Sequence, residues 1–281
     1  MTISTQMVID LRKRTGVGMS KCKEALIEAN GDIEEAIHIL RKKGIASAVK
    51  KGSRETNEGI IGVAETNEAV FLIEVNAETD FVIQNERFKS FLEMMCNEIR
   101  QTAPCSVEAF LQQKCSERPS STIDEYRAEV VQALGENIQL KRMKEWKKAP
   151  NTSLGIYSHM GGKIVCLVAI EGSGDEQLLA RDVAMHVAAE SPDYLNPEEI
   201  PSEALAKEEE IARSQLQNKP QDILNKIVQG KLNAFYEQVC LTRQKYVKDP
   251  SLSVSDYVSG EGKKRGKTLN ILYFARWQIG E

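Results

Sequence analysis

The chain has 281 residues, 41% of them hydrophobic, and its 37 basic and 41 acidic side chains leave a net charge of −4. This length can bury the cores of two or three modest domains. Because the chain has no overall basic field, its composition gives no support to nucleic-acid binding.

The N-terminal sequence lacks the basic start and apolar stretch of a signal peptide, and no run approaches about 18 apolar residues. The cysteines form no Cys-x-x-Cys pair, and no histidine lies at zinc-binding spacing from them. We therefore expect a protein of the cytoplasm that binds neither membrane nor metal and keeps its cysteines reduced.

Residues 1–53 show the apolar spacing of three short helices, with Leu11 on the apolar face of the first. Asp32, with Glu35 three residues later, predicts a capping box at the start of the third helix. The basic stretch 41–54 is expected to be a solvated linker. Nucleic-acid binding by this stretch is the less favoured alternative.

Beyond the linker, the apolar spacing changes to the alternation of strands. Residues 59–65 and 69–75 form a predicted hairpin, and an amphipathic helix follows from about Asn85. The same order returns from Gly155, with two strands and then a helix that ends near Ala189. We infer an internal duplication of a strand-strand-helix plan.

A later strand is expected to complete each copy, 138–143 in the first and 268–279 in the second. In the last strand, alternating apolar residues are expected on one face: Leu269, Ile271, Tyr273, Ala275, Trp277 and Ile279. Two related α+β subdomains therefore form the expected core. The second also carries an insertion, in which helices 202–217 and 221–242 are joined by a break at 218–220.

The segment Asn76–Val82 (Asn-Ala-Glu-Thr-Asp-Phe-Val) joins the second strand of the first copy to its helix. Side chains at such a connection sit on a rigid frame but can face outward. Phe81 is therefore either a core residue at the end of the sheet or a side chain offered to a partner. Composition alone leaves both interpretations open.

No convincing reactive site is found in the sequence. His38, His159 and His186 lie far apart in the chain. Asp182 and Glu190 lie one helical turn to either side of His186, which is conceivable metal spacing, but a packing role for this histidine is favoured.

Gly260–Thr268 looks like a phosphate-binding loop, but Glu261 stands where that loop requires a glycine, and a strand follows instead of a helix. The chain is therefore not expected to bind nucleotide itself. We expect it to work by binding a partner, without catalysing a reaction.

Several motifs occur in order along the chain: Arg14–Met19, Cys22–Leu26, Glu28–Ala36, Thr79–Val82, Gly135–Ile138 and Met185–Ala189. Together they resemble elongation factor Ts, the family that promotes nucleotide exchange on elongation factor Tu in bacterial translation. Two departures affect local packing. The family usually has Cys where Ala77 stands, and Gln-Pro-Phe where this chain has Gln244–Tyr246.

The resemblance implies an α+β fold with four parts. Residues 1–53 would be a three-helix, ubiquitin-associated-like domain with the basic linker, and 54–148 the first α+β core subdomain. Residues 149–195 and 243–281 would form the second subdomain, and 196–242 an inserted antiparallel helical hairpin. Some members of the family dimerise through this hairpin, so self-association stays open here.

The resemblance also implies a binding function. The protein would bind elongation factor Tu–GDP and promote GDP release, while GDP and magnesium stay with the partner and no cofactor is needed. Phe81 would be a wedge that enters the partner's nucleotide domain and disturbs magnesium binding, with hydrogen bonds from Asp80. Thr79 and Val82 would set the connection that aims them.

Further contacts are implied outside this segment. Leu11, Val17 and Met19 would dock the N-terminal helices on the same domain of the partner, although a core role for Met19 is an equal alternative. His159 and Met160, at a hairpin tip, would touch the partner elsewhere, unless His159 is a plain turn residue.

A ubiquitin-associated-type, peptide-binding adaptor is the alternative function, with the α+β core as a passive scaffold. This alternative predicts that Phe81 is buried. An enzyme ranks third and would need one of the three histidines.

Overall fold

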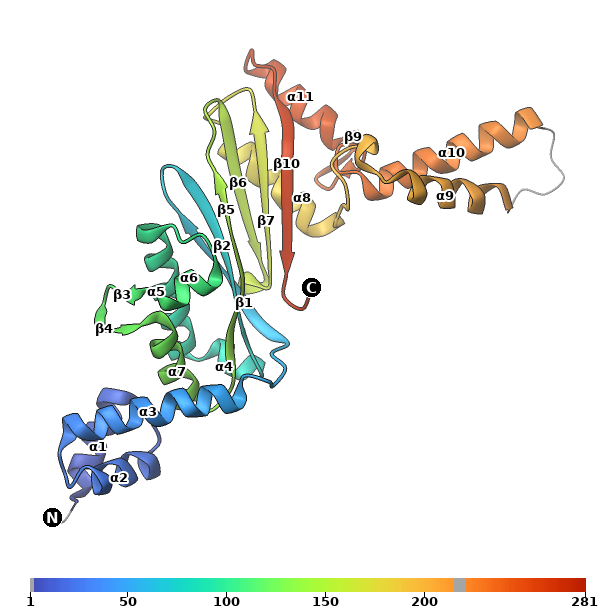
Figure 1. The fold of residues 1–281 in the computed structure, drawn as a ribbon. Coiled ribbons are helices and arrows are strands. Elements are labelled where there is room, and N and C mark those ends of the chain that lie inside the picture. Colours follow the sequence, from blue (N-terminus) through green and yellow to red (C-terminus); the bar gives the residue numbers. More distant parts are fainter. Residues whose placement is uncertain (1–2, 215–220) are drawn as a thin grey trace. The chain divides into compact units, whose positions relative to one another are not determined.

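The computed structural model describes residues 3–214 and 221–281 (Figure 1). The chain combines helices with antiparallel sheets, so the predicted α+β class is confirmed. It divides into two compact units, Met1–Lys147 with Ile279–Glu281, and Lys148–Gln278. The finer division into four parts stays a prediction.

The first unit begins with three helices, α1 (Thr5–Thr15), α2 (Met19–Glu28) and α3 (Ile33–Lys51). The carboxylate of Asp32 accepts a hydrogen bond from the Glu35 N–H at 3.0 Å, so the predicted start of the third helix is confirmed. The apolar faces of these N-terminal helices meet in a small core that includes Leu11 and Leu26.

An antiparallel sheet follows in the first unit, in the strand order β1-β2-β5. Its elements are β1 (Glu58–Glu65), β2 (Ala69–Ala77), α4 (Asp80–Gln84), α5 (Glu86–Thr102), α6 (Val107–Gln112), β3 (Lys114–Cys115), β4 (Arg118–Thr122), α7 (Ile123–Leu134) and β5 (Ile138–Lys147). The central strand β2 is buried along its whole length. Phe71 and Ile73 of β2 belong to the same core as Phe88, Phe91 and Ile99 of α5, as the apolar spacing of that helix predicted.

The prediction that residues 41–54 form a solvated linker is wrong, because α3 continues to Lys51 and packs on α7. Gly44 lies at the contact, where a Cβ would stand 2.8 Å from Oε1 of Gln132. Arg41 forms an ion pair with Glu129 at 2.9 Å. The basic side chains of this stretch thus belong mostly to a packed helix. Contacts with a distant part of the sequence stabilise that helix.

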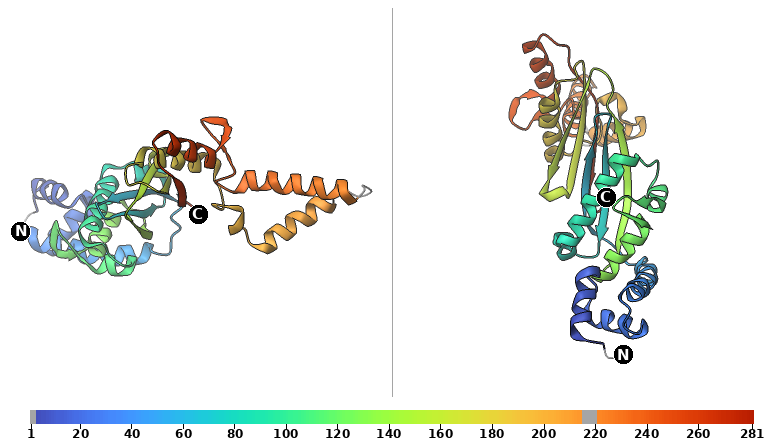
Figure 2. Two further views of the ribbon diagram at one scale, coloured as in Figure 1. Left: turned by 90° about the horizontal axis from the view of Figure 1, so that it is seen from above. Right: turned by 90° about the vertical axis from the view of Figure 1, so that its left-hand side faces the viewer.

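The second unit repeats the sheet order, as β10-β7-β6. Its elements are β6 (Thr152–His159), η1 (Met160–Gly162), β7 (Ile164–Glu171), α8 (Gln177–Glu190), η2 (Pro197–Glu199), α9 (Ser202–Ser214), α10 (Gln221–Val239), β8 (Lys245–Tyr246), β9 (Asp249–Ser253), α11 (Val254–Lys264) and β10 (Asn270–Gln278). Helix α8 packs on β6 and β7 (Figure 2). Val168 and Val183 lie in the resulting core.

The expectation that the last strand keeps its apolar residues on one face is wrong beyond Ile271. Ile271 pairs with Ile170 and Tyr273 pairs with Ala169, so Leu272 is an extra residue in β10. An extra residue exchanges the two faces of a strand. Phe274, and not Tyr273, therefore packs with Ile271 against the core of the second unit.

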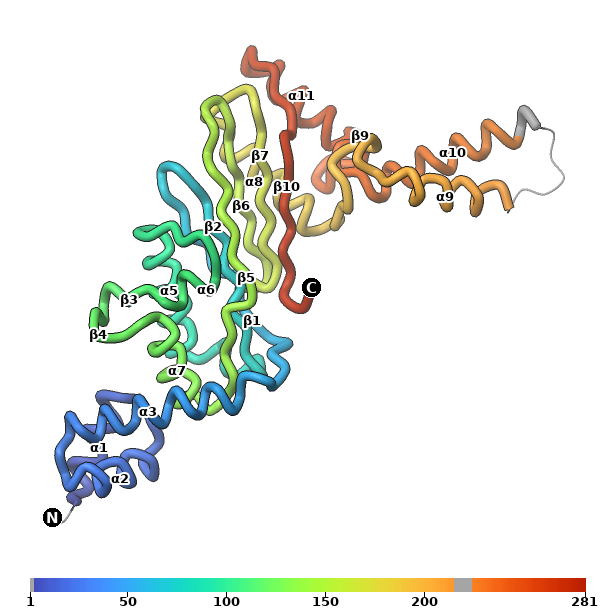
Figure 3. Tube along the Cα trace, in the orientation of Figure 1, coloured from blue at the N-terminus to red at the C-terminus, as the bar shows by residue number. Residues whose placement is uncertain are grey.

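Helices α9 and α10 contact each other and run alongside one another in the chain trace (Figure 3). Ile200, Val239 and Cys240 form a small buried cluster at their base. The predicted break at 218–220 lies outside the described residues.

Candidate functional site

Helix α4 separates its side chains sharply between solvent and core. The Phe81 side chain is 83% exposed and Asp80 is exposed, whereas Val82 and Ile83 are 8% and 1% exposed and belong to the core of the first unit. The helix contacts β1 and β2 through its buried face. The interpretation of Phe81 as a core residue is therefore wrong, and so is the burial that the adaptor alternative predicted.

Two carboxylates hold the connection that precedes α4. Glu136 binds this connection from the segment before β5, and Glu78 binds that segment from the connection. Thr79 donates its N–H to Oε2 of Glu136 at 3.0 Å and its hydroxyl to Oε1 at 2.7 Å. The Asn137 N–H donates to Oε1 of Glu78 at 2.6 Å, and Arg54 pairs with the same carboxylate at 3.2 Å. Sequence reasoning missed this arrangement, although it had singled out Gly135–Ile138 as a motif.

The electrostatics of this connection favour an ionised Glu78. The hydrogen bond from the Asn137 N–H, supported by the Arg54 guanidinium, holds the pKa of the Glu78 carboxyl below its ordinary value of 4.5, although burial acts in the opposite direction. Near neutral pH both bonds to Glu78 are therefore charge-assisted.

Helix α5, which follows α4, is tied to the N-terminal helices. Arg87 Nη2 donates to the main-chain oxygen of Thr15 at 2.7 Å. Gly16 has a φ of 68°, and a Cβ on it would lie 1.4 Å from Nη1 of Arg87. Burial lowers the pKa of Arg87 below its usual range. This contact requires a glycine at position 16.

The three residues expected to dock the N-terminal helices differ in their exposure to solvent. Leu11 and Val17 are 0% and 3% exposed and lie in the core of these helices, so neither side chain is offered to a partner. This corrects the expectation that they form a docking surface. Met19 is partly buried against the same core and keeps some exposed surface, so its predicted contact stays a prediction.

His159 and Met160 lie at the tip of the β6–β7 hairpin, as the sequence predicted. Both are exposed, Met160 with a φ of 50°. His159 stacks on Tyr157 at a ring distance of 6.0 Å, and its Nδ1 lies 3.3 Å from the tyrosine hydroxyl. Tyr157 and His159 together present an aromatic surface in the second unit. The role of His159 and Met160 in binding stays a prediction.

His186 is a packing residue, as the sequence analysis favoured. Its Nδ1 accepts a hydrogen bond from the Val247 N–H at 3.2 Å, so Nε2 carries the proton that is donated to Gln244 Oε1 at 3.0 Å. Burial lowers the pKa of this fully buried imidazole below 6.5. Asp182 instead pairs with Lys248 at 2.8 Å.

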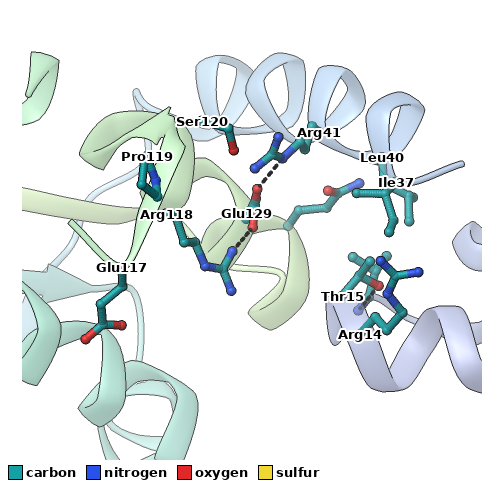
Figure 4. A pocket seen from close by; sticks show the side chains of 12 residues that line it. Arg14, Thr15, Ile37, Leu40, Arg41, Glu117, Arg118, Pro119, Ser120 and Glu129 are labelled. Carbon is teal, nitrogen blue, oxygen red and sulfur yellow. Dashed lines mark hydrogen bonds and ion pairs between the residues drawn. The ribbon is translucent and has the colours of Figure 1, made fainter. Parts of the chain in front are cut away.

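A hollow of about 430 Å³ in the first unit was not foreseen from the sequence. Figure 4 shows Arg14, Arg41, Arg118 and Glu129 around it, and Glu129 pairs with Arg41 at 2.9 Å and with Arg118 at 2.7 Å. Residues of α1, α3, β4 and α7 line this hollow, and the ion pair of Arg41 with Glu129 joins parts of the chain 88 positions apart.

The glycine-rich segment rejected as a phosphate loop is helical at its start, because Gly260 and Gly262 lie within α11. Among residues 3–214 and 221–281, no helix is long and apolar enough to cross a membrane. Nor do these residues contain a group of histidine, cysteine or acidic side chains placed to hold a metal ion.

Comparison with known proteins gives one consistent result. The family model of elongation factor TS matches residues 78–281. Elongation factor Ts of Protochlamydia amoebophila is 56% identical over 279 residues, which cover 99% of each chain. The elongation factors Ts of Chlamydia pneumoniae and Chlamydia felis are 45% and 43% identical, and the matches cover 99% and 96% of this chain and 98% and 96% of the relatives.

Proposed function

Because this chain belongs to the elongation factor Ts family, a family of translation elongation factors, we propose that it binds elongation factor Tu–GDP and promotes GDP release. It acts in the bacterial cytoplasm, where translation takes place. It is not an enzyme and needs no cofactor of its own, since GDP and magnesium are held by the partner. It binds neither nucleotide, nucleic acid nor membrane directly.

Phe81 is the wedge in this proposal, and its exposure is the observation that carries it. A large aromatic side chain that is 83% exposed contributes little to the stability of its own fold. It projects from a short helix whose next two residues are buried, so it is held on a fixed base. Such an aromatic residue is typical of an interface anchor.

The energy required is within reach of a few contacts. Weakening GDP binding about a thousandfold needs about 4 kcal/mol of coupling. One buried aromatic anchor contributes about 2 to 4 kcal/mol at a well-packed interface. By linkage, the coupling is reciprocal, so GDP lowers the affinity of the partner for this protein by the same factor. Insertion of Phe81, with hydrogen bonds from Asp80, would displace the groups that hold magnesium.

Two further surfaces complete the proposed contact. Met19 docks the N-terminal helices on the nucleotide domain, supported by the part of its side chain that stays exposed. His159 and Met160 contact the partner through the hairpin tip of the second unit, supported by the exposure of both.

The same family membership supports the finer architecture. The N-terminal helices form a ubiquitin-associated-like domain. The two α+β subdomains arose by duplication, which is supported by the matching strand orders β1-β2-β5 and β6-β7-β10, each with a helix after its hairpin. Helices α9 and α10 form an inserted hairpin through which the protein could dimerise.

Release of fluorescent GDP from elongation factor Tu tests this function. The protein should accelerate release in a concentration-dependent manner until the rate saturates, because it acts by forming a complex with the partner. If release proceeds at the spontaneous rate at every concentration, the exchange function is wrong.

A further inference from the structure

Side chains extend the pairing between β2 and β5 beyond the end of their ladder. The main-chain pairing of β2 with β5 ends at Ala77. In the same register, Glu78 lies opposite Asn137 and accepts its N–H at 2.6 Å, and Thr79 lies opposite Glu136 and donates to it twice. Hydrogen bonds to the two carboxylates thus continue the pairing of the strands for two more residue pairs.

The contact between Thr79 and Glu136 acts on the start of α4, because Thr79 is the N-cap of this helix. A threonine at this position usually accepts a hydrogen bond from the first turn of its helix. In this structure Thr79 makes no such side-chain cap bond, and its hydroxyl donates to Glu136 at 2.7 Å. Since the Thr79 N–H donates to the other oxygen of the same carboxylate at 3.0 Å, both the main chain and the side chain of the cap are fixed from outside the helix.

Helix α4 needs such external support because it has only five residues. A helix of this length has no stability of its own in water. Val82 and Ile83 hold its inner face in the core, but they do not hold its N-terminal end, where Asp80 and Phe81 are exposed. Glu136 holds that end through its two hydrogen bonds to Thr79, the residue before Asp80.

We propose that Glu136 is a positioning residue for nucleotide exchange, which aims Phe81 through its two hydrogen bonds to Thr79. This inference rests on the proposed function, in which Phe81 is the wedge. Glu136 itself need not touch the partner. It lowers the number of orientations open to α4 before binding, so that the ordering cost of inserting Phe81 falls.

Glu136→Gln tests the inference, with Glu145→Gln as the matched control. Glutamine keeps the size of the side chain but replaces one of the two carboxylate oxygens by an NH₂ donor, so one of the two hydrogen bonds from Thr79 loses its acceptor. Glu145 is an exposed glutamate on β5, the strand that follows Glu136, and its substitution changes the net charge equally. The measurements are the maximal rate of GDP release from elongation factor Tu and the concentration that gives half of that rate.

Glu136→Gln should lower the maximal rate about tenfold, the order expected when a hydrogen bond to a charged group is lost. The half-saturating concentration should stay as in wild type, because the other contact surfaces are intact. In a Phe81→Leu background, which keeps a smaller wedge, Glu136→Gln should add little. Glu145→Gln should behave as wild type.

Thr79→Val and Thr79→Ser keep the test valid if Glu136→Gln does not fold. Thr79→Val removes only the hydroxyl bond and should slow release, whereas Thr79→Ser retains this bond and should release GDP faster than Thr79→Val. A wild-type rate in Glu136→Gln and in Thr79→Val would overturn the inference, as would an undiminished effect of Glu136→Gln in the Phe81→Leu background. These outcomes differ from failure of the exchange function, in which wild type itself does not accelerate release.

Discussion

The guanidinium of Arg87 donates a 2.7 Å hydrogen bond to the main-chain oxygen of Thr15, the last residue of α1. The two residues are far apart in sequence, and Arg87 belongs to the helix that directly follows α4. The N-terminal helices and the segment that presents Phe81 are therefore joined through one side chain, in addition to the packing of α3 on α7.

Gly16→Ala should loosen this connection. The substitution places a Cβ on Nη1 of Arg87 and strains a residue with a φ of 68°. Loss of the hydrogen bond and the strained backbone together should cost about 2 to 3 kcal/mol. Urea unfolding measures the loss, and limited proteolysis near residue 16 shows where the chain opens. Gly18→Ala is the matched control, because a Cβ there meets nothing within 4 Å; an equal loss in this control would contradict the explanation.

Phe81→Ala and Ile83→Ala should differ strongly in stability although the two residues belong to one helix. Ile83 is 1% exposed, so its truncation leaves a cavity and should cost about 2 to 5 kcal/mol. Phe81 is 83% exposed, so its truncation should change the free energy of unfolding by less than about 0.5 kcal/mol. Thermal and urea unfolding of both variants provide the comparison. A large loss in Phe81→Ala would mean that Phe81 packs in the free protein.

The second unit should lose stability in mild acid because of His186. Its pKa in the folded protein lies below the ordinary value of 6.5, so the unfolded chain binds the proton more tightly. The free energy of unfolding should therefore fall as the pH decreases below 6.5, by up to about 1.4 kcal/mol for each unit of pKa difference.

The dependence on His186 can be isolated by substitution. His186→Gln should be less stable than wild type near neutral pH, but its stability should change less between about pH 7.5 and about pH 5. His38→Gln, at an exposed position on α3, should keep the pH dependence of wild type. An unchanged pH dependence in His186→Gln would exclude His186 as its source.

Local patterns of the sequence were sufficient for many elements. The N-cap at Asp32 and the apolar face of α5 were predicted from spacing alone, because neighbours along the chain determine both. The extra residue Leu272 in β10 was not predicted, since strict alternation continues through it in the sequence. The helical continuation of α3 depends on the contact of Gly44 with α7, which local spacing does not contain.

The candidate site shows the same limit. The sequence placed Phe81 between a strand and a helix but left its exposure open, because exposure depends on how Val82 and Ile83 fill the core. Leu11 and Val17 were assigned to a surface through the family resemblance, whereas tertiary packing buries both. The contact of Glu136 with Thr79 joins residues 57 positions apart, so a motif could mark Glu136 but not its role.

The central claim, that Phe81 is the exchange wedge, is tested most directly by GDP release from elongation factor Tu with wild type and Phe81→Ala side by side. Removal of an anchor of about 3 kcal/mol should lower the maximal release rate more than about a hundredfold, in a variant that unfolds at the same temperature as wild type. A folded Phe81→Ala protein that releases GDP as fast as wild type would contradict the account.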